Sequence, residues 1–281
     1  GYSFAEKNPT KFHGVGKFDK KSGKTESTSG ITYSKMAGQT LTNLACEDKD
    51  IVVITAAMSD GTGVKPFVEK FPSRFFDVGI AEEYAISFAS GISNFGLKPV
   101  FMVYSTFLQR GYDQIIHDIC LNNLPMLFLI DRAGVVGQDG KTHQGIYDIS
   151  LLSSIPNLTI MAPRDVIELK NMIVYALSKK CAIAIRYPKG VSKSTSFSKY
   201  KEIESGMMEV LNIGEKVAMF GLGACFSIAE EVFIKLKNIG INATLVNPRF
   251  VFPINEESMC KLLRKNKYVV TIEDGILDGG Y

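Results

Sequence analysis

The chain has 281 residues, of which 46% are hydrophobic; 32 are Lys or Arg and 29 are Asp or Glu, for a net charge of +3. This length favours two domains over one. The charges are spread along the chain without a basic patch, and no apolar run approaches the roughly 20 residues of a membrane span, so we expect a soluble protein that binds neither nucleic acid nor membrane.

The five cysteines are odd in number and include no CxxC pair. This pattern favours reduced thiols in a cytoplasmic protein over disulfides or zinc ligands. We expect a bacterial cytoplasmic location, or a plastid if the source is eukaryotic. Free cysteine is among the most buried residue types, so we also expect all five to be buried: Cys46, Cys120, Cys181, Cys225 and Cys260.

The first part of the chain has little to bury. Residues 14–30, GVGKFDKKSGKTESTSG, are rich in Gly, Lys and Ser and are typical of a linker. The chain starts without an initiator methionine or a signal-peptide pattern. We therefore assign residues 1–31 to a linker from an amino-terminal domain that precedes Gly1.

Residues 32–190 alternate short apolar runs with helical patterns. Because the runs are too continuously apolar to leave one face wet, they predict a mainly parallel sheet covered by helices on both sides. Asp165 is the expected N-cap of one helix, and Glu82 falls in the first turn of another. The expected strands lie within residues 51–58, 74–78, 98–104, 126–130, 158–162 and 182–187.

The polar stretch 191–206 reads as a second linker, and residues 207–281 as another α/β block. GLGACF, residues 221–226, starts like a dinucleotide-binding GxGxxG, but residue 226 is Phe. A structural glycine turn is therefore favoured over a nucleotide site. About 75 residues are few for an α/β domain, so we expect this carboxy-terminal domain to be incomplete.

Polar residues follow the expected strands, and ligands of parallel sheets bind where strands end. The loop DRAGVVGQDGKTHQG, residues 131–145, carries two cations, two carboxylates, a histidine and four glycines. A simple connection needs two to six residues. Glycines let a loop approach a ligand closely, so the sequence indicates a binding or catalytic site here.

Other residues at the strand ends allow more than one interpretation. Glu82 suits a helix N-terminus through the helix dipole alone. His117, four residues after Asp113, is better explained as a structural Asp–His pair or an interface contact. Arg110 lies nearer the strand end and is a candidate pocket residue. Arg186 ends a strand before a proline, where a guanidinium can hold a phosphate through two hydrogen bonds.

Five segments together are specific enough to indicate a family. In chain order they closely resemble the 1-deoxy-D-xylulose-5-phosphate synthase family of transketolase-like enzymes, over the whole chain and most strongly over residues 32–190. The resemblance implies an α/β, transketolase-like, parallel-sheet pyrimidine-binding domain followed by a truncated carboxy-terminal α/β domain. The segments are FHGVGKFD (12–19), RFFDVGIAEEYA, YSTFLQRGYDQIIHD, DRAGVVGQDGKTHQG and RYPKG.

The family implies a transferase that uses thiamine diphosphate and Mg²⁺ to condense pyruvate with D-glyceraldehyde 3-phosphate. CO2 is released, and the product is a precursor of isoprenoids and thiamine. A GDG followed by Asn, which holds magnesium and diphosphate in thiamine enzymes, is absent from the sequence. The resemblance places those ligands in the amino-terminal domain, so we expect this piece alone to be inactive, with that domain and a second copy as partners.

The resemblance also implies roles for single residues. Glu82 matches the acid that hydrogen-bonds the pyrimidine ring nitrogen and so favours the imino tautomer, whose nitrogen can remove the thiazolium C2 proton. Phe107 matches the aromatic ring that stacks on the pyrimidine. Met58 matches a position near the thiazolium, and Ile80 belongs to the same cofactor-binding set.

A second group would handle the substrates. Arg132 and Arg186 resemble the phosphate clamp of the aldehyde, with Arg110 as a further substrate-binding residue. The proton-exchanging and positioning residues would be Tyr104, Asp139 and His143. His13 matches a histidine near the substrate; the alternative is a histidine in an untethered linker.

The sequence departs from the family at AEEY, where AEQH is common, so Glu83 and Tyr84 replace an amide and an imidazole. This sequence therefore lacks the histidine through which a proton relay could run. Two other functions stay open: the beta subunit of a 2-oxoacid dehydrogenase, whose separate alpha chain would bring the diphosphate site, and a non-catalytic transketolase-like homologue. The THQG loop and paired arginines argue against the dehydrogenase, because acyl transfer to lipoamide needs no sugar-phosphate clamp.

Overall fold

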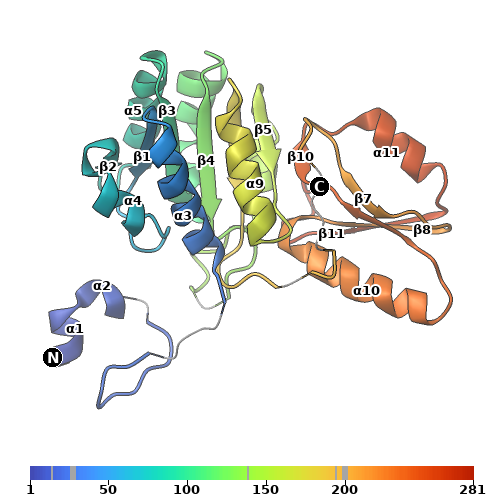
Figure 1. The fold of residues 1–281 in the computed structure, drawn as a ribbon, viewed down its shortest axis with the longest axis horizontal. Helices are drawn as coiled ribbons and strands as arrows, with labels where there is room; N and C mark the ends of the chain where they lie inside the picture. Colours follow the sequence, from blue (N-terminus) through green and yellow to red (C-terminus); the bar gives the residue numbers. More distant parts are fainter. Residues whose placement is uncertain (14, 26–29, 138, 194, 198–201) are drawn as a thin grey trace.

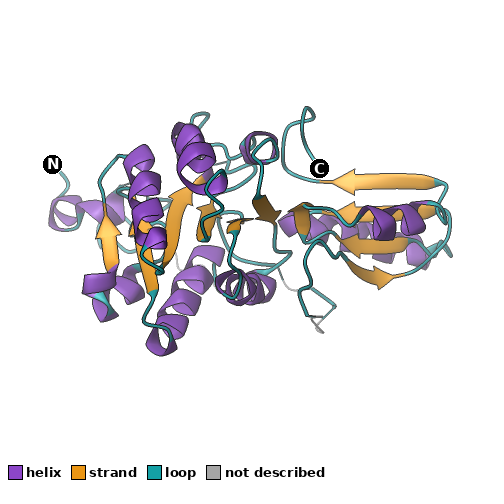
Figure 2. Ribbon diagram, turned by 90° about the horizontal axis from the view of Figure 1, so that it is seen from above, coloured by secondary structure: helices purple, strands orange, loops and turns teal. Residues whose placement is uncertain are grey.

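A computed structural model describes residues 1–281 except 14, 26–29, 138, 194 and 198–201. Two sheets lie side by side in it, with helices packed against each (Figures 1 and 2). The larger sheet has the strand order β10-β5-β6-β4-β3-β1-β2. Its strands are β1 (Ile51–Thr55), β2 (Phe75–Asp77), β3 (Lys98–Tyr104), β4 (Met126–Asp131), β5 (Leu158–Met161), β6 (Ala182–Arg186) and β10 (Phe250–Phe252).

All pairings within the larger sheet are parallel except that of β10, which runs antiparallel to β5. Alternate residues of the apolar strands point to opposite faces, so each face buries its own core. The expected parallel sheet with helices on both sides is confirmed. One core packs beneath α3 (Tyr33–Glu47), α4 (Lys65–Lys70) and α9 (Val166–Leu177), the other beneath α5 (Glu82–Asn94) and α8 (Asp148–Leu152).

Local signals in the sequence set several helix starts. The carboxylate of Asp165 accepts hydrogen bonds from the backbone N–H groups of Ile167 and Glu168, each at 2.9 Å, as expected for the N-cap of α9. Glu82 is the first residue of α5, also as expected. Both helices are therefore fixed where their first turns reach the sheet edge.

The segment after β3 is helical but is not one continuous α-helix. It comprises α6 (Ser105–Leu108), a 3-10 turn η2 (Gln109–Gly111), α7 (Tyr112–Gln114) and a π-helical stretch η3 (Ile115–Cys120). Gly111 packs so closely on α5 that an added Cβ would lie 2.3 Å from the Ile86 side chain. The wider π turn lets Ile115, Ile119 and Cys120 all face the core.

The smaller sheet has the order β11-β8-β9-β7 and packs against α10 (Phe226–Asn238) and α11 (Glu256–Leu263). The GLGACF stretch forms the turn from β8 into α10. Gly223 has φ 56°, and a Cβ there would lie 3.2 Å from the Cβ of Ala162, which follows β5 of the larger sheet. This agrees with a structural glycine turn. The strands are β7 (Glu209–Asn212), β8 (Val217–Gly221), β9 (Thr244–Asn247) and β11 (Tyr268–Ile272).

The amino-terminal residues form α1 (Ser3–Lys7) and α2 (Pro9–Phe12). The rings of Tyr2 and Phe18 contact each other and the ring of Phe12. The linker expected at 14–30 lies partly outside the described residues, and its described part includes an isolated bridge between Phe18 and Thr25. Part of the second expected linker, 191–206, also lies outside them. Among the described residues, no helix is both long and apolar enough to cross a membrane.

The prediction that all five cysteines are buried is wrong. Cys120 is buried, but Cys46 and Cys260 are exposed and the other two are half-buried. Cys46 lies in the last turn of α3. Cys260 lies on α11, which has no buried residue among those described. Position on a helix, rather than residue type, decides their exposure.

A buried ion network joins the two regions next to β10. Glu168 of α9 accepts hydrogen bonds from Arg249 Nε at 2.8 Å and from Asn247 Nδ2 at 2.9 Å. Glu209 of β7 pairs with Arg249 Nη2 at 3.2 Å and with Arg164 Nη1 at 3.0 Å. Burial raises the pKa of Glu168, while Arg249 acts in the opposite direction. Asp165 also pairs with Arg164 Nε at 3.3 Å, so three carboxylates and two guanidiniums are paired with one another away from water.

Removing one cation from this network should be costly. Arg249→Met leaves the buried carboxylates of Glu168 and Glu209 short of a partner, so we expect the free energy of unfolding to fall by about 3–5 kcal/mol. Urea denaturation measures the change. Arg264→Met, at an exposed arginine that ends α11, is the control and should stay within about 0.5 kcal/mol. Equal effects of both substitutions would contradict the assigned role of the network.

Candidate active site

A cavity of about 840 Å³ opens at the carboxyl edge of the larger sheet. Its size lies within the range of small-molecule and cofactor sites, roughly 300–1,000 Å³. Residues that follow β1, β2, β3 and β4 form its wall, together with residues of the amino-terminal segment. Eight residues predicted from the sequence line it: His13, Met58, Ile80, Glu82, Tyr104, Phe107, Arg132 and His143.

Glu82 is a buried acid at the wall of this cavity. Its side chain is 3% exposed, and its Oε2 has no hydrogen-bond partner among the described residues. Arg110 Nη1 lies 3.5 Å from Oε2, which is an ion-pair contact without hydrogen-bond geometry. The N-terminus of α5 favours the negative charge. Because an unsatisfied buried polar atom is unfavourable, Glu82 is suited to bind a polar group of a ligand.

Arg110 lies outside the residues that line the cavity. Its Nε donates a 2.8 Å hydrogen bond to Glu83, and its side chain is 53% exposed. A backbone hydrogen bond and Arg110 together lower the pKa of Glu83, so that carboxylate stays charged at neutral pH. Arg110 is therefore shared between two neighbouring acids, and its substrate-binding role stays a prediction.

Aromatic rings form a second part of the wall. Tyr104 and Phe107 stack with centroids 5.8 Å apart, and His143 meets Phe107 edge-on at 5.3 Å. The Arg132 guanidinium lies 3.6 Å from the centroid of the Tyr104 ring. Burial raises the pKa of Tyr104 to about 12, so its hydroxyl stays protonated and can donate a hydrogen bond. Gly61 leaves room for that hydroxyl, since a Cβ there would lie 1.5 Å from it.

The loop 131–145 is closed at its base by backbone hydrogen bonds between Gly134 and Gly145, at 2.7 and 2.9 Å. Within it, Asp139 pairs with Arg132 Nη1 at 3.5 Å and with the ammonium group of Lys189. Asp139 is not among the cavity-lining residues. Of its two cationic partners, Arg132 lines the cavity. The predicted catalytic role of Asp139 stays a prediction.

Asp131, the last residue of β4, begins the loop indicated by the sequence, but sequence reasoning gave it no role of its own. It is fully buried; Ser34 Oγ donates a 2.6 Å hydrogen bond to its Oδ2, and its Oδ1 has no hydrogen-bond partner within the described part of the chain. Burial raises the pKa of Asp131 to about 7, against the effects of Ser34 and Arg132. The available signal was its position as the first residue of the glycine-rich loop.

Arg186 does not line the cavity. Its side chain is 3% exposed and pairs with Asp148 at 2.9 Å and with Asp274 at 3.0 Å. Burial alone would lower the pKa of Arg186, but the two carboxylates raise it. Sequence reasoning missed both acids. Its predicted role as a phosphate ligand stays a prediction.

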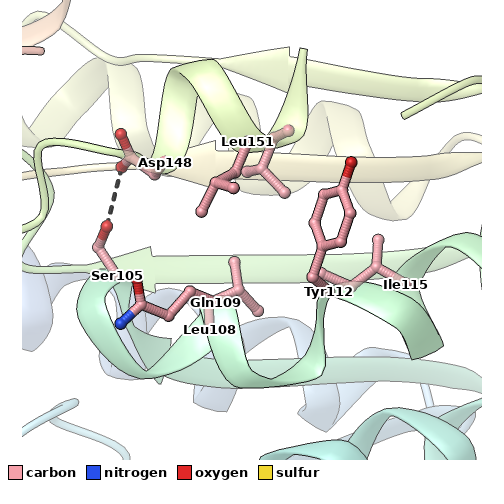
Figure 3. A pocket seen from close by; sticks show the side chains of 8 residues that line it. Ser105, Leu108, Gln109, Tyr112, Ile115, Asp148 and Leu151 are labelled. Atoms are coloured by element: carbon pink, nitrogen blue, oxygen red, sulfur yellow. Dashed lines mark hydrogen bonds between the residues drawn. The ribbon is translucent and has the colours of Figure 1, made fainter. Parts of the chain in front are cut away.

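A small hollow of about 10 Å³ lies beside Asp148, between the helical segment after β3 and α8 (Figure 3). Ser105 donates a 3.1 Å hydrogen bond to Asp148 at one end, and Leu108, Tyr112 and Leu151 supply an apolar lining. The hollow has room for about one water molecule.

Further along the helical segment after β3, His117 Nδ1 lies 2.9 Å from Asp113 Oδ1, which confirms the expected structural pair.

The larger sheet is mainly parallel, has helices on both faces and has a ligand-sized cavity at its carboxyl edge. The class is therefore an α/β protein that binds a small molecule or cofactor where its strands end. Residues 29–193 match the family described as transketolase, pyrimidine binding domain, and residues 206–281 match transketolase, C-terminal domain. The chain belongs to the transketolase family.

Among curated proteins, the 1-deoxy-D-xylulose-5-phosphate synthases of Clostridium tetani and Clostridium kluyveri are each 49% identical to this chain over 281 residues. These matches cover 100% of this chain and 45% of each relative, so the chain spans less than half the length of the proteins it matches. The resemblance stated from the sequence motifs is confirmed.

Solved structures agree on the fold. A split gene transketolase, described as an inactive beta4 tetramer, has a TM-score of 0.80 at 30% identity and covers 90% of this chain and 82% of its own. A transketolase mutant from Pichia stipitis has a TM-score of 0.75 at 18% identity, covering 88% and 39%. The second likeness concerns the fold alone.

The buried carboxyl of Asp131 should make stability depend on pH. The pKa of Asp131 rises from 3.8 to about 7 on folding. Its favourable contribution to the free energy of unfolding is therefore complete below pH 4, decreases as pH rises, and is lost once pH has passed 7. Asp131→Asn keeps an acceptor for Ser34 but cannot titrate. Between pH 4 and 8 the free energy of unfolding of the parent should fall relative to the variant, by on the order of 3–4 kcal/mol. Urea denaturation across this range tests it, and parallel curves would contradict it.

Proposed function

We propose that the complete protein is a thiamine-diphosphate-dependent 1-deoxy-D-xylulose-5-phosphate synthase, a transferase that condenses pyruvate with D-glyceraldehyde 3-phosphate and releases CO2. The observation that carries the proposal is the buried Glu82 carboxyl, whose Oε2 lacks a hydrogen-bond partner within the described residues at the wall of the cavity. Membership of the transketolase family and the similarity to curated synthases support it.

The residues at the cavity fit the aminopyrimidine part of the cofactor. Glu82 offers a buried oxygen for a ring nitrogen, Phe107 offers an aromatic face, and Met58 and Ile80 offer apolar contacts. Ile80 is 76% exposed in this chain, so its side chain is open to a ligand. When bound, thiamine diphosphate would supply a carbon nucleophile and an electron sink for decarboxylation.

Other residues of the site would act on the acceptor aldehyde. Arg132 supplies positive charge for an anionic substrate. The protonated hydroxyl of Tyr104 can donate to a substrate oxygen, and the imidazole of His143 can exchange a proton with another. His13 reaches the same cavity from the amino-terminal segment. Arg132 and Lys189 pair with Asp139 and would orient its carboxylate.

We propose that Mg²⁺ and the diphosphate are held by the amino-terminal part of the complete protein. Among the described residues of this chain, no group of three or more His, Cys, Asp or Glu side chains is placed to hold a metal ion. We also propose that the chain alone is inactive and that its partners are that amino-terminal part and a second copy in a homodimer. The split gene transketolase, whose tetramer is described as inactive, is consistent with this arrangement.

We also propose the domain limits inferred from the sequence: 1–31 and 191–206 as linkers, 32–190 as the pyrimidine-binding domain and 207–281 as part of the carboxy-terminal domain. Strand β10 crosses this division: its residues belong to the region 207–281, but they pair with β5 of the larger sheet.

The mechanism predicts different effects for two adjacent acids. In the complete protein, Glu82→Gln should lower the rate of synthase turnover at least about 100-fold, because the carboxyl can no longer tune a bound pyrimidine. Glu83→Gln, which restores the residue common in the family, should stay within about threefold. Steady-state assays with pyruvate, D-glyceraldehyde 3-phosphate, thiamine diphosphate and Mg²⁺ measure both.

Two results would reject parts of this proposal. Activity of the Glu82→Gln variant within a few fold of the parent would remove the role of Glu82. Pyruvate decarboxylation that ignores the aldehyde phosphate would reject the synthase and favour a 2-oxoacid dehydrogenase subunit.

A further inference from the structure

The two carboxylates that pair with Arg186 are held very differently. Asp148 is 1% exposed and accepts three hydrogen bonds: from Ser105 Oγ and Arg186 Nε at its Oδ2, and from the Ile149 N–H at its Oδ1. Asp274 is 24% exposed and, within the described residues, has one hydrogen bond, to Arg186 Nη1 at 3.0 Å. Asp148 is a fixed partner, and Asp274 is the one that can leave.

Asp274 also lies against the site loop. A Cβ built at Gly134, which has φ 76°, would lie 1.8 Å from Asp274 Oδ2. Gly134 belongs to the closed base of the loop that carries Arg132 and His143. The Asp274 carboxylate therefore fills a position between the Arg186 guanidinium and the loop that borders the cavity. It belongs to the segment after β11, which ends on the side of the smaller sheet that faces the larger one (Figure 1).

The guanidinium is only partly used in this arrangement. Arg186 Nη2 is buried and has no hydrogen-bond partner among the described residues. A phosphate can take two N–H groups of one guanidinium at once, whereas Asp274 takes Nη1 alone. One arginine with two carboxylates has a net charge of −1, so a phosphate dianion would be repelled while Asp274 remains in place.

We propose that Asp274 is a built-in counter-anion of Arg186 that the phosphate group of the substrate displaces. In this view Arg186 becomes a phosphate ligand only when Asp274 moves away. A dianionic phosphate that binds both Nη groups competes with Asp274 more strongly than a monocarboxylate such as pyruvate, because it carries more negative charge. Asp274 is thus a specificity-determining residue, and the inference rests on the proposed function for the identity of the phosphorylated substrate.

Inorganic phosphate serves as the probe, titrated calorimetrically into the complete protein without pyruvate or cofactor. Asp274→Asn removes the competing charge, so phosphate should bind roughly five- to tenfold more tightly than to the parent. Asp278→Asn is the matched control: it removes a carboxylate from the same segment, while the hydrogen bond from Ser150 to the Asp278 backbone carbonyl is retained. Its phosphate affinity should equal that of the parent.

Adding Arg186→Lys to the Asp274→Asn variant should abolish the gain, because the two-pronged guanidinium is lost. Unchanged or weaker phosphate binding by Asp274→Asn, or an equal gain with Asp278→Asn, would overturn the inference. Should Asp274→Asn fail to fold, hydrogen exchange of residues 273–281 in the parent decides: phosphate should increase it, and a decrease or no change would overturn the inference. If the complete parent protein shows no condensation activity, the proposed function is rejected. The phosphate titration still tests whether Asp274 competes with phosphate for Arg186.

Discussion

The parallel register of β1, β3, β4 and β6 is the constraint on which the site depends. Tyr104 at the end of β3 stands beside Asp131 at the end of β4, and Ile130 stands beside Arg186 at the end of β6. Because parallel strands all finish at one edge, the polar residues that follow them converge there. The apolar residues of the same strands bury both faces of the sheet, so the edge that presents the site is attached to a rigid core.

Each arginine at this edge is paired with one or more carboxylates of the chain. Arg132 is paired with Asp139, Arg110 with Glu82 and Glu83, and Arg186 with two further carboxylates. Such pairing holds each guanidinium in one orientation before a ligand arrives, which reduces the reorganisation needed on binding. It also means that a substrate anion must compete with a carboxylate of the protein. Glu82 differs, since its Oε2 retains unused hydrogen-bonding capacity among the described residues.

The sequence predicted the features that local pattern controls. Continuous apolar runs indicated the parallel sheet, the position of Glu82 after RFFDVGIA indicated the start of α5, and Asp165 indicated an N-cap. Features that depend on distant pairing were missed. Asp274 lies 88 residues from Arg186, and the three-residue β10 joins a sheet whose other strands end more than 60 residues before it. No local period encodes such contacts, and the sequence motifs equally could not show that Arg186 is buried.

The central claim is that the carboxyl of Glu82 receives the aminopyrimidine of thiamine diphosphate. A crystal structure of the complete protein with thiamine diphosphate and Mg²⁺ tests it most directly. We predict that a Glu82 oxygen lies within hydrogen-bond distance, about 2.6–3.2 Å, of the pyrimidine ring nitrogen, with the Phe107 ring against the pyrimidine face. A pyrimidine bound elsewhere, with Glu82 directed into the protein interior, would contradict the account.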